Sequence, residues 1–122
     1  MAHNHEHTMP SSEMQQCIQA CLDCYAVCTT TAAHCLALGR EHASPEHQTT
    51  LLDCAKLCQT SADFMLRGSH LHQQVCAVCA EACRACEQSC ERLGSSDTMM
   101  QRCAEACRAC AESCERMAGM AM

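Results

Sequence analysis

Aromatic residues are almost absent from this chain of 122 residues, which contains one Tyr, one Phe and no Trp. A core of ordinary composition takes much of its buried area from aromatic side chains. Basic residues are also few, because eight Lys and Arg stand against fourteen Asp and Glu, which gives a net charge of −6 with neutral His. This acidic balance argues against binding of nucleic acid or of an anionic membrane surface, since both require clustered basic residues.

Targeting and membrane-spanning patterns are missing as well. The first ten residues lack a basic stretch followed by an apolar run, and we expect no secretory signal and no transmembrane segment. The expected location is therefore the cytoplasm, a compartment that keeps thiols reduced.

Cysteine is the abundant residue, with sixteen copies. This share lies above the roughly 8–10% that marks a chain dominated by disulfides or metal sites. In a reducing compartment, such a number points to metal ligands or catalytic thiols rather than to disulfides. The sequence therefore predicts that cysteine fills the space that large apolar side chains occupy in other cores.

Four helices are predicted, because Ala, Glu, Gln, Arg and Leu dominate four segments that are bounded by capping residues and glycines. The short linkers between them favour an all-α fold, an antiparallel up-down-up-down four-helix bundle with a cysteine-lined core. The expected organisation is a flexible His-containing tail over residues 1–10 and one domain over 11–119, with helices at about 11–39, 45–67, 69–93 and 96–118.

A repeated cysteine frame, C-x3-C-x2-C-x3-C, begins at Cys17, Cys79 and Cys103. Alternating steps of three and four residues place side chains on one stripe of a helix, and their mean period of about 3.5 is that of a bundle seam. Every cysteine falls on such a stripe, although the second helix continues its stripe with Ser61 and Met65. We expect all sixteen to face the bundle axis as metal ligands, namely Cys17, Cys21, Cys24, Cys28, Cys35, Cys54, Cys58, Cys76, Cys79, Cys83, Cys86, Cys90, Cys103, Cys107, Cys110 and Cys114.

Copper(I) is the metal that these stripes favour. Packing alone does not account for sixteen cysteines, because buried Leu or Ile would contribute more, about 1.5–3 kcal/mol each. Disulfides within a helix would be strained, since neighbouring Cβ atoms lie about 5–6 Å apart and a disulfide needs about 3.8 Å. Soft thiolates select Cu(I), and one ion per thiolate leaves a core without net charge. We expect on the order of sixteen ions per chain from this ligand count.

The remaining soft ligands are predicted to separate by end. One end of an antiparallel bundle would gather Met and His side chains, which suit copper relay, and there we expect copper to enter and leave. The relay candidates are Met14, Met65, His70, His72, Met117 and Met120. The opposite end is expected to be mainly an apolar plug, although it also holds His and Met; its residues are Leu36, Leu38, Leu51, Leu52, Leu93, His34, His42, His47, Met99 and Met100.

The cysteine frame, repeated along helices with Met and His at one mouth, resembles that of the cytosolic bacterial copper storage proteins over about residues 11–118. The resemblance implies storage and buffering of many Cu(I) ions inside a four-helix bundle, and a homotetramer. The implied partners are copper ions and a copper chaperone or chelator that exchanges them. Ser61 and Met65 depart from an all-cysteine pattern, and the resemblance leaves the local copper geometry there open.

Two other metal-binding functions are weighed against copper storage. A prefolded detoxifier similar to metallothionein would take Zn, Cd or Cu through the same thiolates. An Fe–S electron carrier is less favoured, because its cysteines converge from loops and the run here lacks the Cys-Pro signature. An enzyme is not expected, since no Ser/His/Asp or paired-carboxylate arrangement is evident and a thiol nucleophile needs only one cysteine.

Overall fold

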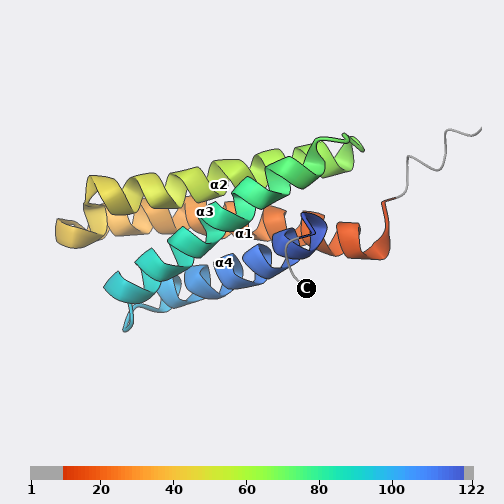
Figure 1. The fold of residues 1–122 in the computed structure, drawn as a ribbon. Coiled ribbons are helices and arrows are strands. Elements are labelled where there is room, and N and C mark those ends of the chain that lie inside the picture. Colours follow the sequence, from red (N-terminus) through yellow and green to blue (C-terminus); the bar gives the residue numbers. More distant parts are fainter. Residues whose placement is uncertain (1–9, 120–122) are drawn as a thin grey trace, which may run out of the picture.

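The computed structural model describes residues 10–119, which form four long helices and one short 3-10 helix and contain no strand. Each helix contacts its neighbours in sequence, and the fourth also contacts the first, so the four close around one axis. Successive helices run in opposite directions along that axis (Figure 1). The elements are α1 (Ser12–Leu38), η2 (Arg40–Ala43), α2 (Pro45–Leu66), α3 (His72–Leu93) and α4 (Thr98–Met117).

Side-chain caps fix where the helices begin. The Ser44 hydroxyl accepts a hydrogen bond from the His47 N–H at the start of α2, and Pro45 occupies the first turn, where its missing N–H has no cost. The Asp97 carboxylate likewise accepts from the Met100 N–H at the start of α4. Such a cap stabilises a helix by about 1 kcal/mol. Because Ser44 and Asp97 lie in the short linkers, the linkers determine where α2 and α4 begin.

The third helix begins later than the sequence-based estimate of residue 69. Gly68 adopts a positive φ of 70°, and the Ser69 hydroxyl accepts a hydrogen bond from the Leu71 N–H, so this segment forms a turn. Helix α3 therefore starts at His72. The turn shortens α3 to the same 22 residues as α2, its antiparallel partner.

The core is built from cysteine and alanine. All sixteen cysteines are buried, none more than 1% exposed, and six buried alanines lie between them. Few large side chains are fully buried, and they are Leu51, Met65, Met100 and His47. The helices therefore enclose a column of sulfur atoms instead of a layer of leucines and aromatic rings.

Helix α1 is long and apolar enough, by length and composition alone, to cross a membrane. This differs from our expectation that no segment would have that character. Much of the apolar character comes from its five cysteines, and all five are buried in the bundle. A core helix of a bundle passes the same test, so the composition of α1 follows from its place in the sulfur-lined core.

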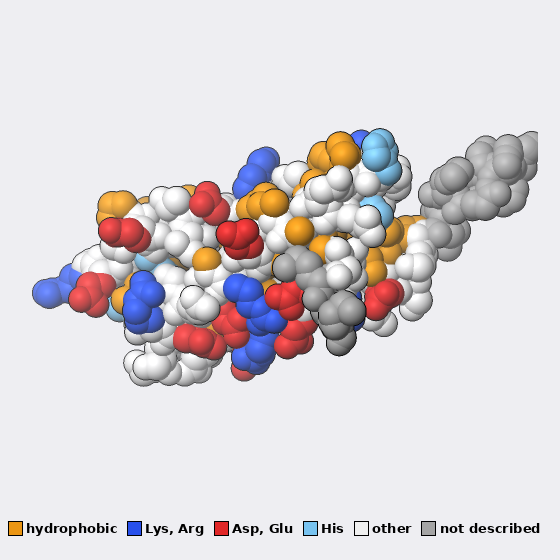
Figure 2. Space-filling view, viewed as in Figure 1, with side chains coloured by type: hydrophobic (Ala, Val, Ile, Leu, Met, Phe, Trp, Pro, Cys, Tyr) orange, Lys and Arg blue, Asp and Glu red, His pale blue; other side chains and the backbone are white. Residues whose placement is uncertain are grey.

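Charged side chains lie on the outside, mixed in sign over α3 and α4 (Figure 2). Arg84 forms an ion pair with Glu115 at 3.0 Å, which links α3 to α4, and a second with Glu87 at 3.2 Å within α3. Histidine and apolar side chains gather instead where α2 passes into α3 (Figure 2). On this surface, the charged side chains therefore lie apart from the end of the bundle where the sequence predicts copper exchange.

Candidate metal centre

The stripes of the four helices bring cysteine sulfurs together across the bundle axis. Cys17 and Cys21 of α1 lie 3.8 and 3.6 Å from the sulfur of Cys114 in α4. Cys58 of α2 lies 3.6 Å from Cys83 of α3. The first two contacts join the start of α1 to the end of α4, as an antiparallel pair requires, and the third joins the middle of α2 to the middle of α3.

Cys28 lies at a meeting point of all four helices. Its sulfur is within 3.8 Å of five other sulfurs, those of Cys24, Cys54, Cys86, Cys103 and Cys107. Sulfur–sulfur contacts of 3.6–4.0 Å connect thirteen of the cysteines into one network, namely Cys17, Cys21, Cys24, Cys28, Cys54, Cys58, Cys79, Cys83, Cys86, Cys103, Cys107, Cys110 and Cys114. We call this network the sulfur column.

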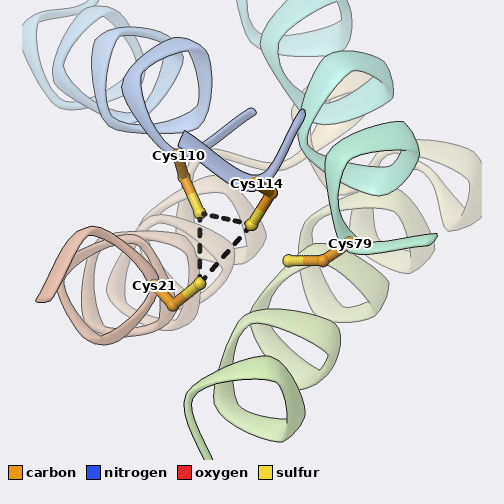
Figure 3. A group of neighbouring side chains, drawn as sticks. All are labelled: Cys21, Cys79, Cys110 and Cys114. Carbon is orange, nitrogen blue, oxygen red and sulfur yellow. Dashed lines mark hydrogen bonds between the residues drawn. The ribbon is translucent and has the colours of Figure 1, made fainter. Parts of the chain in front are cut away.

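Groups of four sulfurs recur along the sulfur column. In one of them, Cys21, Cys79, Cys110 and Cys114 all lie within 4.8 Å of one another, and their side chains converge from α1, α3 and α4 (Figure 3). Other groups share members, because Cys24 and Cys54 belong to two of them. The column is therefore a continuous series of overlapping ligand sets, rather than a row of separate four-ligand sites.

All the cysteines are free thiols, and their contacts change their acidity. The contact with Cys107 lowers the pKa of Cys24, whereas the contact with Cys103 raises the pKa of Cys28. A thiol that donates to the next sulfur stabilises the thiolate form of its neighbour. A soft cation that replaces these protons meets preformed pairs of sulfur ligands.

At the end where α2 passes into α3, Cys76 adjoins side chains of other types. Cys76 Sγ lies 3.9 Å from both Met65 Sδ and Ser61 Oγ, and both partners are fully buried. The departure of α2 from the cysteine pattern therefore leaves a thioether and a hydroxyl beside Cys76. Both groups are weaker ligands for Cu(I) than the thiolates of the sulfur column.

The other relay candidates are less closely grouped. Met14 and Met117 are half-buried and pack against the core, while His70 is exposed. The ring of His72 is half-buried, and its Nδ1 lies 2.8 Å from the Ser69 carbonyl oxygen. Met120 lies outside the described residues.

The opposite end is only in part the apolar plug that the sequence predicted, because Leu51 and Met100 are fully buried there and other predicted residues are not. Three of its leucines face solvent, with exposures of 61% for Leu36, 47% for Leu38 and 49% for Leu52. His47 is also buried in the core at this end, and its side chain is only 1% exposed. A signal for this was present, because His47 precedes Leu51, Cys54 and Cys58 at steps of four, three and four, on the inward stripe of α2.

A family model described as copper storage protein matches residues 10–119. The chain belongs to this family. Among solved structures, the Nmul_A1745 protein of Nitrosospira multiformis is 44% identical with a TM-score of 0.83, over 89% of this chain and 97% of that one. A cytosolic copper storage protein of Streptomyces lividans, described as loaded with five coppers, is 30% identical with a TM-score of 0.79, over 88% and 92%. The Cu(I)-bound copper storage protein BsCsp3 is 32% identical with a TM-score of 0.81, over 88% and 99%.

Proposed function

We propose that this copper storage protein holds Cu(I) in the cytosol at roughly one ion per cysteine, with all sixteen thiolates as ligands. The observation that carries the proposal is the sulfur column, in which buried sulfurs lie 3.6–4.0 Å apart along the bundle. Cu(I) needs only two or three soft ligands, so neighbouring sulfurs suffice at every level of the column. The relatives described as Cu(I)-bound and as cytosolic support the metal and the compartment.

Charge favours copper over a divalent ion. If each thiolate bridges two ions and each ion takes two thiolates, one Cu⁺ neutralises one sulfur. Four Zn²⁺ on sixteen thiolates would instead leave about eight negative charges in the core. Each uncompensated buried charge costs several kcal/mol, so the total would exceed the stability of about 5–15 kcal/mol that a typical domain has.

A Zn or Cd detoxifier is the second candidate, and the four-sulfur groups are the reason to test it. Tetrahedral zinc with bonds of about 2.3 Å to sulfur requires sulfurs about 3.8 Å apart. The spacing of 3.6 Å between Cys110 and Cys21 and of 4.0 Å between Cys110 and Cys114 is close to that value. Shared membership of the groups prevents all of them from being filled at once.

Anaerobic titration with Cu(I) against a strong Cu(I) chelator tests the proposal. We expect uptake to saturate near sixteen ions per chain, from the ligand count, with the helical content unchanged because the column is preformed. Saturation near four Cu(I) ions would contradict a filled core. Zinc that displaces copper from the chain, or binds as tightly, would favour the second candidate.

We propose further that copper enters and leaves at the end that holds Met65 and Cys76. The thioether of Met65 lies 3.9 Å from the first thiol of α3 and binds Cu(I) less avidly, as a relay ligand should. Combined replacement of Met65 by Leu with Ala at His70, His72 and Met117 should slow loading and leave capacity almost unchanged. Met99→Leu at the other end is the control. Equal loading rates in the two variants would contradict this route.

The remaining parts of the proposal rest on family resemblance. We propose that the protein is a homotetramer that exchanges copper with a chaperone or chelator and performs no catalysis. Light scattering of the apo and loaded protein gives the assembly size. A monomer in both states would contradict the tetramer while leaving the copper proposal intact.

A further inference from the structure

At the end opposite the proposed copper route, a histidine and a cysteine face each other inside the bundle. Nε2 of His47, in α2, lies 3.4 Å from Sγ of Cys35, in α1. Neither side chain is more than 1% exposed. The imidazole is held from its other side, because Nδ1 lies 2.7 Å from the Ser89 hydroxyl in α3. Three helices thus fix one ring in one orientation.

The ring presents a lone pair to the thiol. When Nδ1–H donates to the Ser89 hydroxyl, Nε2 is left as an acceptor for the Cys35 S–H. Burial lowers the pKa of His47 and raises the pKa of Cys35, so it favours the uncharged form of each group. A neutral imidazole nitrogen and a thiol that can lose one proton make a ligand pair for a soft cation.

The two neighbouring histidines at this end are used differently. His34 Nε2 lies 2.8 Å from an Asp97 carboxylate oxygen, and His42 Nε2 lies 3.2 Å from the Leu93 carbonyl oxygen. Both side chains are partly exposed. His34 joins the end of α1 to the residue before α4, and His42 joins η2 to the end of α3. His47 is the one of the three that faces sulfur, so its position is not explained by capping or turn structure.

A second polar group is buried nearby without a partner. Thr31 follows the stripe of α1 one helical turn before Cys35, and it is fully buried. Its hydroxyl oxygen has no hydrogen-bond partner within residues 10–119. A buried hydroxyl left unpaired destabilises the folded state. Thr31 and His47 therefore make this end of the core more polar than an apolar plug would be.

We propose that Cys35 and His47 form a mixed sulfur–nitrogen site for Cu(I), separate from the sulfur column, with Ser89 as its positioning residue. The proposal rests on Cu(I) being the cargo. Cu⁺ forms one bond to Sγ and one to Nε2, the S–H bond breaks, and its proton passes to solvent. The thiolate and the ion cancel in charge, and the imidazole adds none, so the loaded site is neutral.

The distance between the two atoms sets the geometry. With bonds of about 2.3 Å to sulfur and about 2.0 Å to nitrogen, as for zinc, an ion spans 3.4 Å with a bent angle at the metal. A linear arrangement needs the atoms to separate by about 0.9 Å more, which small side-chain rotations supply. Because imidazole is a harder ligand than thiolate, this site should bind copper less tightly than the sulfur column and fill after it.

Nitrogen NMR of the full chain with ¹⁵N-labelled histidine tests the site without any substitution. During anaerobic Cu(I) titration, the His47 Nε2 resonance should shift late, as the last ion binds, while the ring resonances of His34 and His42 keep their positions. An unchanged His47 resonance at saturation, with thiolate uptake complete, overturns this site and leaves the proposed function standing. Absence of thiolate uptake overturns both.

Matched variants give a second readout. His47→Gln should lower the copper capacity by about one ion per chain, whereas His34→Gln should keep it. Ser89→Ala should shift the Nδ1 resonance of His47 and weaken retention of the last ion, while Ser113→Ala, with the same 5% exposure, should do neither. Equal capacity in His47→Gln and His34→Gln, or equal retention in the two serine variants, overturns the assignment.

Discussion

Loading of the sixteen cysteines with Cu(I) should release about one proton per copper ion and leave the net charge of the chain unchanged. The perturbation is stepwise addition of Cu(I) to the reduced apo protein. Metal binding to thiols releases protons because the thiolate is the ligand. The proton count per ion therefore measures how many thiols each metal deprotonates.

The structure fixes the expected magnitude. All sixteen thiols are free and no more than 1% exposed, so each enters the reaction within a core that disfavours net charge. One Cu⁺ per thiolate gives about one proton per ion and about sixteen in total. A divalent ion in a four-sulfur group would release about four protons and add two negative charges to the core.

Anaerobic titration in weakly buffered solution, with the released acid measured by back-titration at constant pH, counts these protons directly. Each bound copper should release about one proton, from the first ion to the last. The same measurement with Zn(II) is the control, in which fewer ions should bind and each should release more protons. Copper that binds without releasing protons, or that releases two per ion, would refute the argument that charge balance selects monovalent copper.

Three further changes test the fold around the column. Ser61→Cys restores a fully buried position on the α2 stripe and should raise Cu(I) capacity by about one ion; an unchanged titration endpoint would contradict this. Gly94→Ala places a Cβ 2.5 Å from Cβ and Sδ of Met100, and this overlap should lower the free energy of unfolding in urea by about 1–3 kcal/mol. An unchanged free energy of unfolding would show that the helix end relaxes freely. Asp97→Ala should cost about 1 kcal/mol at neutral pH through loss of the α4 cap. Because the contact with His34 lowers the pKa of Asp97, the carboxylate stabilises the fold above its unfolded-state pKa, and the deficit of the variant should shrink as the pH falls through the folded-state value.

The stripes were predictable from sequence because they depend only on local geometry. A helix of 3.6 residues per turn carries steps of three and four on one face, so the burial of the cysteines follows from their spacing alone. Which sulfurs meet was not predictable. The contact of Cys28 with both Cys86 and Cys103 depends on how far α3 and α4 are shifted along the axis relative to α1, and linker structure decides that shift. The late start of α3 at His72 is one such detail.

The incomplete prediction for the far end has a similar cause. Distance along the helices places residues at that end, but it does not determine which face of a helix they occupy. Leu36 lies one position past Cys35 and therefore off its stripe, and Leu38 is the last residue of α1; both are exposed. His47 lies on the inward stripe of α2 and is buried. Helical phase predicts burial better than membership of an end does.

The distribution of bulk along the axis explains how one core can serve both folding and storage. Large buried side chains lie near the two ends, with Leu51 and Met100 at one and Met65 at the other, while cysteine and alanine fill the middle. Alanine lets the helices approach closely, and cysteine contributes less buried area than leucine would. The apo bundle therefore gains least where copper binds. Since metal bound only to the folded state adds to its stability, sulfur–copper bonds across the helices should stabilise the part of the core that packing leaves weakest.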